Sequence, residues 1–525
     1  MGVLNGLDKV IAVFNPNAAL KRVVARKKLD VINTGYSHHG ASKSKKSLSG
    51  WSSAGGSTRE DIDDNLTILR ERSRDLYMGA PIATGAIKTI RTNVVGSGLM
   101  LRPQLDYEVL KMTNEEAKTW ERNVQREFSL WADSPHCDAE RMNNFYELQQ
   151  LIFISFLMSG ECFALLPYIK RPNMPYDLRI KLIEADRVST PNNKTYDKNI
   201  INGVEIGKYG EVLAYYFSNF HPLCSTNIGT KEWKRVSKYG EKTGRPNVLH
   251  LMEAERPEQR RGVPILAPVI ESLKQLSRYS EAELIAAVIS GMFTVFIESP
   301  GEIETDNNPF GQSNFNITDN QTDTTSTEPE EESRVELGNG AVVELGEGEK
   351  INVANPGRPN ANFDGFVTSI CRQIGAALEL PYELLVKQFT ASYSASRASL
   401  LEAWKMFRMR REWLSNDFCQ PLYEEWLSEA IAKGRIYAPG FFTNPIIKKA
   451  YCGAEWNGPT QGQLDPLREV NASIKKVENG FSTRTRETQE LTGGNYDVYI
   501  RQRKGEEELM KEVKDIYVKA EEQYE

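Results

Sequence analysis

The stretch PILAPVIESLKQLSRYSEAELIAAVISGM, residues 264–292, decides the fold of the chain around it. Pro264 and Pro268 stand where a helix would begin, and proline is tolerated there because the N–H it lacks has no intrahelical partner in the first turn. Beyond the prolines, apolar residues recur at helical spacing with charged residues between them, which predicts one long helix. The apolar face carries Leu273, Leu276, Leu284, Ala287 and Val288, and the polar face carries Glu271, Lys274, Arg278, Glu281 and Glu283.

An insertion separates this helix from a second one. Residues 301–333 hold nine acidic residues and no Lys or Arg, which predicts a disordered acidic loop. Residues 363–378 predict the second apolar helix. A helix, an inserted β region and another helix together predict an appendage that projects from a body. The short strands of the insertion are predicted at 293–298, 335–337, 341–345 and 350–353.

A polar loop joins the second helix to the longest helical pattern in the chain. The loop, residues 387–395, contains Tyr393 among serines and threonines. From residue 396 to 433, apolar residues three or four positions apart predict a long helix. Pro421 lies inside it and removes a backbone donor, so we expect a kink. Trp404, Trp413 and Trp426 are expected in the core.

The residues on either side of this central region also show regular patterns. Residues 59–255 predict one α+β unit, and residues 1–58 carry nine Lys or Arg against two acids. That basic segment is either a flexible arm or one that contacts phosphate or a partner shell. The α+β unit has predicted helices at 59–78, 81–95, 114–131 and 145–160 and predicted strands at 161–169, 178–188, 202–219 and 246–251, and further helices are predicted at 465–492 and 498–524.

Composition limits the class of protein. The chain has 525 residues, 40% of them hydrophobic, 26% charged, and a net charge of −6, so it folds into a few domains and is no polycation. Contact with nucleic acid would need a local patch or a loose enclosure. The six cysteines have no metal-binding spacing, and neither a membrane span nor a signal peptide is evident, so we expect a cytoplasmic protein with reduced thiols.

Catalytic motifs are not found in the sequence. G-x-x-x-x-G-K-[ST], G-x-G-x-x-G, H-E-x-x-H and G-x-S-x-G do not occur. The adjacent His38 and His39 would point to opposite sides of an extended segment, which disfavours a metal site. We therefore expect no catalytic residues, no metal and no cofactor.

Several short motifs, in this order and spacing, resemble the lambda-type portal protein family of tailed bacteriophages. The resemblance covers roughly residues 60–515, and its most specific run leads from His250 through Arg261-Gly262-Val263-Pro264 to Pro268. The acidic segment 301–333 follows no pattern of the family. The other matching motifs are Arg74-Asp75-Leu76, Asn93-Val94-Val95-Gly96, Gly160-Glu161, Leu182-Ile183-Glu184-Ala185-Asp186-Arg187, Tyr393-Ser394, Leu400-Leu401-Glu402-Ala403-Trp404, Trp456-Asn457-Gly458 and Asp465-Pro466.

The resemblance implies an α+β subunit of a portal ring with long helices, one of them kinked. Portals form homo-oligomeric rings, usually of twelve subunits, at one vertex of the phage head, and double-stranded DNA passes through them. The partners implied are the terminase large subunit, the head–tail connector and the major capsid protein, with no membrane. The location implied is the virion, after assembly in the host cytoplasm. The implied regions are a flexible basic arm (1–58), wing (59–263), stem helix (264–292), clip with the acidic loop (293–362), second stem helix (363–386), tunnel loop (387–396), kinked helix (397–439) and crown with C-terminal helices (440–525).

The resemblance also implies which side chains face DNA, although each has an alternative role. Lys274 and Arg278 would line the stem bore or else lie on an outward, solvated face. The tunnel loop would face the DNA or else be an ordinary connector between helices. Two other functions stay open, a nuclease-like packaging enzyme and a monomeric head scaffold or adaptor. The tunnel-loop candidates are Lys387, Gln388, Ser392, Tyr393 and Ser394.

Overall fold

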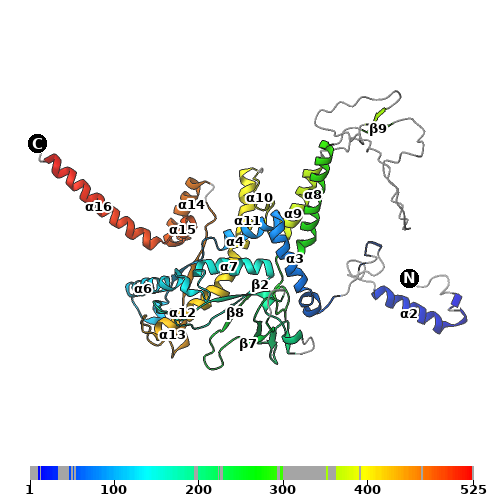
Figure 1. The fold of residues 1–525 in the computed structure, drawn as a ribbon, viewed down its shortest axis with the longest axis horizontal. Helices are drawn as coiled ribbons and strands as arrows, with labels where there is room; N and C mark the ends of the chain where they lie inside the picture. Colours follow the sequence, from blue (N-terminus) through cyan, green and yellow to red (C-terminus); the bar gives the residue numbers. More distant parts are fainter. Residues whose placement is uncertain are drawn as a thin grey trace, which may run out of the picture. The chain divides into compact units, whose positions relative to one another are not determined.

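The structure, a computed structural model, divides into two units, Met1–Asp64 and Asn65–Glu525 (Figure 1). Unit 1 contains helix α2 (Pro16–Ile32), a short 3-10 turn (Lys46–Leu48) and a π-helical turn (Arg59–Asp63). The sequence did not predict α2 within the basic arm. The structure describes residues 10–11, 13–32, 46–48, 51, 55–193, 199–222, 224, 229–292, 296–298, 350–352, 362–389, 392–462 and 465–522.

The helices of the body begin and end close to the predicted residues. They are α3 (Leu66–Gly79), α4 (Pro81–Val94), α6 (Asn114–Ala132) and α7 (Phe145–Ser159), joined by the short α5 (Tyr107–Leu110). The predicted helix at 59–78 is instead a π-helical turn followed by α3, and the boundary between the two units falls between them. Two of these helices start at capping boxes, Thr113 with Glu116 for α6 and Asn144 with Glu147 for α7.

Two antiparallel sheets and one strand pair complete the body. The three-stranded sheet has the order β3–β2–β8, formed by Lys181–Glu184, Glu161–Leu165 and Val248–Met252. Strand β2 ends earlier than predicted because Pro167 has no N–H to donate to the ladder. The four-stranded sheet has the order β4–β5–β6–β7, formed by Ile200–Ile201, Val204–Ile206, Val212–Ser218 and Trp233–Ser237.

The long helix predicted at 264–292 is shorter in the structure. Pro268 lies in a 3-10 turn, Ala267–Val269, and the α-helix α8 runs over Ile270–Met292. Proline disfavours helical geometry at the residue before it, so the α-helix starts only after Pro268. Helix α9 (Phe363–Ala377) packs alongside α8 (Figure 1), with the Tyr279 ring 5.3 Å from the Phe363 ring.

Two short strands of the insertion are described. Strands β9 (Phe296–Glu298) and β10 (Lys350–Asn352) pair antiparallel, close to the predicted positions 293–298 and 350–353. The predicted acidic loop 301–333 and the predicted strands at 335–337 and 341–345 lie outside the described residues.

The longest helical region is interrupted just before Pro421, where the sequence predicts a kink. After α10 (Tyr382–Val386) come α11 (Tyr393–Leu414), a π-helical turn (Ser415–Cys419) and α12 (Gln420–Ala432). Pro421 lacks the N–H that would bond to the carbonyl of Asp417, which accounts for the π-helical turn directly before it. Trp426 is fully buried in the core, its ring 5.0 Å from Phe128, while Trp413 is only half-buried.

The C-terminal part of the chain contributes one strand to the body. Strand β11 (Ala454–Asn457), after α13 (Pro445–Tyr451), pairs antiparallel with β1 (Met100–Pro103). Helices α14 (Pro466–Glu478), α15 (Arg484–Thr492) and α16 (Tyr496–Glu522) follow. The helical region predicted at 465–492 consists of two helices, and the break between them contains Gly480, whose φ of 73° is the left-handed conformation common just after a helix end.

The structure also gives the state of the six cysteines, and its described residues can be searched for a membrane-spanning helix and for a metal-binding cluster. All six cysteines are free, and every one except Cys224 is buried. None of the helices in the described residues combines the length and apolar character that a membrane span needs. Within the same ranges, no three His, Cys, Asp or Glu side chains gather to hold a metal ion.

Candidate functional site

The exposed loop between α10 and α11 contains three of the seven predicted site residues, Lys387, Gln388 and Ser392. Lys387 ends α10 in a left-handed conformation, with φ 56°, and Gln388 follows it on the surface. At the other end of the loop, the Ser392 hydroxyl accepts a hydrogen bond from the Ala395 N–H at 3.4 Å and caps α11. Lys387, Gln388 and Ser392 are therefore exposed polar residues at two helix ends.

The loop is shorter than the sequence predicted. Helix α11 begins at Tyr393, so Tyr393 and Ser394 belong to its first turn rather than to the loop. The predicted start at residue 396 was wrong because the cap at Ser392 lets the helix begin three residues earlier. Ser394 is exposed on that first turn.

The helix before the loop is fixed against its neighbours. The Leu385 side chain is buried, and the Tyr382 hydroxyl lies 3.4 Å from the Thr368 Oγ1 on α9. The Arg372 guanidinium lies 5.6 Å from the centre of the Tyr382 ring. Lys387 and Gln388 thus follow directly after an anchored helix, which fixes their position.

Lys274 and Arg278, the two other predicted site residues, lie one turn apart on α8. Both side chains are exposed, whereas Leu273 and Leu276 on the same helix are buried. In the part of the chain that the structure describes, no hydrogen bond or ion pair joins these two cations to the loop or to an acid. The structure therefore brings the loop residues together and leaves Lys274 and Arg278 on a separate helix.

A buried ionic cluster lies at the base of α8. The Glu161 carboxylate is completely buried and accepts hydrogen bonds from Arg70 Nη2 at 2.7 Å and from Arg261 Nε at 2.6 Å. His250 Nε2 lies 2.8 Å from the same carboxylate, and the Gly262 N–H donates to it at 2.9 Å. One carboxylate thus connects α3, β2, β8 and the segment that leads into α8.

The protonation states in this cluster follow from burial and charge. Burial by itself would raise the pKa of Glu161, but the charges of Arg261 and Arg70 outweigh burial and hold it well below its usual value. Burial lowers the pKa of His250, so its ring is neutral at pH 7 and donates from Nε2 to Glu161. The cluster at pH 7 is a carboxylate held between two guanidinium groups.

Two glycines let the chain cross itself beside this cluster. Gly160 ends α7 with φ 84°, and its neighbour across the crossing is Gly262. A Cβ at Gly262 would lie 2.0 Å from the Gly160 carbonyl oxygen, and one at Gly160 would lie 2.4 Å from the Val263 carbonyl carbon. Both positions require glycine, because neither backbone segment can move without disturbing the buried carboxylate.

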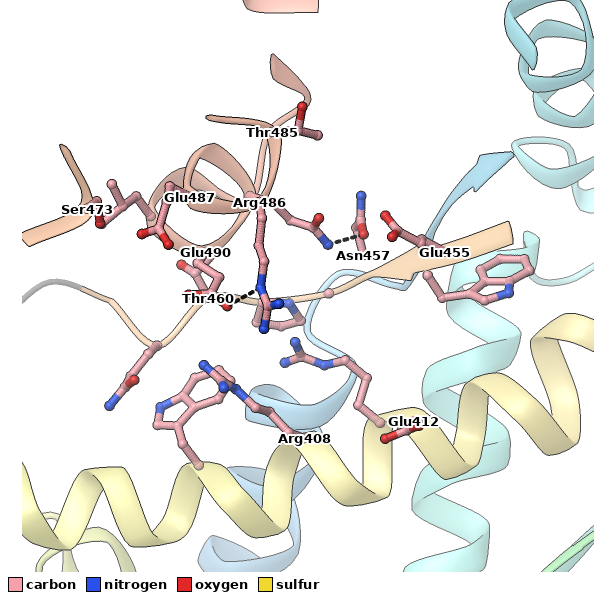
Figure 2. A pocket seen from close by; sticks show the side chains of 18 of the residues that line it. Arg408, Glu412, Glu455, Asn457, Thr460, Ser473, Thr485, Arg486, Glu487 and Glu490 are labelled. Atoms are coloured by element: carbon pink, nitrogen blue, oxygen red, sulfur yellow. Dashed lines mark hydrogen bonds and ion pairs between the residues drawn. The ribbon is translucent and has the colours of Figure 1, made fainter. Parts of the chain in front are cut away.

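A cavity of about 1300 Å³ opens between α11, the segment after β11, and α14 and α15 (Figure 2). Arg411 donates from Nη2 to the Asn93 carbonyl at 2.7 Å and from Nε to the Val94 carbonyl at 3.0 Å. Burial, with a smaller contribution from the Arg408 charge, lowers the pKa of Arg411 to about 10. Arg486 bonds to Glu490 at 3.4 Å, and Figure 2 shows Arg408 and Arg486 reaching into the cavity from opposite walls.

The ionic cluster and the cavity were not predicted as sites, although part of the signal was present. The sequence singled out Gly160-Glu161 and the run from His250 to Pro264 as motifs, but nothing local indicates that they converge or that Arg70 joins them. The one local sign is an acid, Glu161, at the head of the apolar strand Cys-Phe-Ala-Leu. Arg408 and Arg411 read as ordinary polar helix residues.

Comparison with known proteins gives consistent results over most of the chain. The family described as "Phage portal protein, lambda family" matches residues 44–411. Portal protein B of Escherichia phage lambda is 26% identical over 479 residues, covering 89% of this chain and 88% of that protein. The portal protein of Escherichia phage N15 is 25% identical over 480 residues, covering 89% of each.

Among solved structures, a chain from the virion of a native gene transfer agent particle is similar. It has a TM-score of 0.42 and 15% sequence identity, and the similarity covers 81% of this chain and 92% of that chain. A chain from the neck of the native particle, computed with C12 symmetry, has the same TM-score with 14% identity.

Proposed function

Because the chain belongs to the lambda family of phage portal proteins and functions as a portal ring subunit, we propose that twelve copies close around a channel for double-stranded DNA. The observation that carries this proposal is the match with two curated portal proteins over 89% of the chain and nearly the same share of theirs. The ring would stand at one vertex of the phage head. Assembly would take place in the host cytoplasm before the ring enters the virion.

The proposed partners follow from this position. Before the head is filled, the ring would bind the terminase large subunit, and afterwards the head–tail connector. The major capsid protein would surround it. We infer a structural rather than an enzymatic role. In this proposal the ring positions DNA and its partners, while the terminase supplies the energy that moves DNA into the head.

The proposed regions divide the described helices by task. Residues 264–292 and 363–386 would form the stem, 293–362 the clip, 59–263 the wing, 397–439 the kinked helix and 440–525 the crown. The proposal for the tunnel loop rests on its exposed polar residues and its anchored helix ends. Lys274 and Arg278 would line the stem bore, which agrees with their exposure on α8.

Assembly state tests the proposal first. The purified full-length chain is expected to have a mass near twelve times 59.3 kDa and to form rings with a central hole in negative-stain images. A ring of slightly different number still supports a portal. A stable monomer at high concentration would contradict it in favour of an adaptor or scaffold, and metal-dependent cleavage of DNA by the pure protein would favour a packaging nuclease.

The loop has a test of its own. Lys387→Glu replaces a positive by a negative charge in every copy, so rings of unchanged mass are expected to package DNA about tenfold less efficiently in a packaging assay. Lys111 is a matched control, because it is an exposed lysine with the same backbone angles, φ 56° and ψ 38°, at the end of α5. Equal packaging by Lys387→Glu and wild type, or an equal defect in Lys111→Glu, would contradict a DNA-facing loop.

A further inference from the structure

One wall of the cavity has an unpaired charge beside exposed apolar side chains. Among the described residues, Arg408 has no hydrogen bond or ion pair, whereas Arg411 nearby donates to two backbone carbonyls. Leu401, seven positions earlier on α11, is 46% exposed and lies on the same side of the helix. The cavity therefore presents a free guanidinium and an apolar surface next to each other.

Helix α16 presents the complementary pattern. The carboxylates of Glu507 and Glu508 pair locally, with Arg503 at 2.9 Å and with Lys504 at 3.7 Å. Glu506 forms no such pair with any residue in the ranges described above. Leu509 and Met510, three and four positions beyond Glu506 and thus on its face of the helix, are each 62% exposed.

We propose that α16 of one copy lies in the cavity of a second copy, with Glu506 against Arg408 and with Leu509 and Met510 against Leu401. This inference rests on the proposed ring, because it needs a neighbouring copy. An amphipathic helix in a groove buries its apolar positions while its charged residues set the register. The 27 residues of α16 extend about 40 Å, far enough for its distal half to reach beyond its own subunit.

The lining of the cavity favours a polypeptide over the DNA backbone. The carboxylates of Glu412, Glu469 and Glu490 line the cavity together with the arginines and would repel a run of phosphates. The apolar side chains of Leu400 and Leu401 offer nothing to phosphates but fit Leu509 and Met510. A helix with one unpaired carboxylate and two apolar side chains matches both the unpaired guanidinium of Arg408 and the apolar leucines of the lining.

Cross-linking between differently tagged copies tests this contact directly. In a Cys224→Ser background, which removes the least buried native cysteine, tagged Arg408→Cys chains are co-assembled without DNA with untagged Glu506→Cys chains and oxidised. The expected product is a disulfide-linked species of one tagged and one untagged chain. Lys504→Cys, two residues away on another face of α16, is the matched control and should give roughly fivefold less product.

The outcomes separate this contact from the proposed function. Rings of the expected mass without the mixed species would overturn the contact and leave the portal proposal intact. So would equal cross-linking from Lys504→Cys, or an intrachain disulfide when one chain carries both cysteines, or a cross-link that forms only with duplex DNA. Absence of any ring would reject both proposals.

Charge reversal gives a second measurement on chains without new cysteines. Arg408→Glu and Glu506→Arg are each expected to lower the ring yield at a fixed protein concentration by about fivefold, since each juxtaposes like charges. The two substitutions combined should restore the yield, because they recreate an opposite-charge pair. An additive loss in the combined variant would count against the contact.

Discussion

Replacement of Glu161 by Gln is expected to lower the free energy of unfolding by about 3–5 kcal/mol, the cost of leaving a buried charge without its partner. The substitution keeps the size of the side chain but removes the charge that holds Arg70 and Arg261, both of them buried. Two guanidinium groups would then be desolvated side by side. Urea unfolding of the full-length chain, followed by tryptophan fluorescence, measures the change as a shift of the midpoint.

A paired control separates burial from charge. Glu205 forms an ion pair of similar geometry with Arg235, with bonds of 2.7 and 2.9 Å, but the Arg235 side chain is 44% exposed. Glu205→Gln should therefore cost less than about 1 kcal/mol. Equal midpoints for the two variants would show that the buried cluster contributes no more than a surface pair.

The pH dependence of Glu161→Gln gives an independent check on the same carboxylate. The folded pKa of Glu161 lies below its unfolded value of about 4.3, so its contribution is complete above that pH and is lost as the pH falls toward the folded pKa. Wild type should lose stability between about pH 5 and about pH 3 more steeply than the variant, because over that range the unfolded chain protonates Glu161 while the folded chain keeps it ionised. Parallel losses would mean that Glu161 does not titrate differently on folding.

Gly262→Ala is expected to lower the free energy of unfolding by about 3 kcal/mol, near the upper end for overpacking in a core. The added methyl group would lie 2.0 Å from the Gly160 carbonyl oxygen and 2.5 Å from its carbon, and both are backbone atoms that cannot rotate away. Relief would require separating the two segments, which would also pull the Gly262 N–H from Glu161. The urea midpoint of the full-length variant measures this effect.

A second glycine supplies a control of opposite sign. Gly85 lies within α4, and a Cβ there would meet nothing within 4 Å. Gly85→Ala should therefore raise stability by about 0.5–1 kcal/mol, because alanine loses less backbone entropy in a helix. If both alanine variants shift the midpoint in the same direction, the close crossing at Gly262 is not what determines its effect.

The local elements could be predicted because their signals are local. Helices α6 and α7 start where expected. Each begins at a capping box formed by two residues three positions apart, Thr113 with Glu116 and Asn144 with Glu147. The interruption before Pro421 was predictable for the same reason. The start of α11 was missed because several serines compete for the cap, and only the folded backbone selects Ser392.

The ionic cluster and the cavity could not be predicted because they depend on distant contacts. Arg70 and Glu161 are 91 residues apart, and Arg261 is another 100 beyond Glu161. Each reads locally as an ordinary charged residue, and burial alone turns the three into a unit. The family resemblance marked Glu161 and Arg261 as motif residues without stating what they do.

The pairing of β1 with β11 has a consequence for synthesis of the subunit. The Arg102–Glu455 ion pair on these strands joins residues 353 positions apart. At about 5–20 residues per second, a ribosome needs roughly 20–70 s to make the chain between them. Throughout that time β1 has no partner strand, so the nascent chain cannot complete its body. Maturation of the subunit therefore waits for the end of translation, which delays contact between copies until each chain is nearly finished.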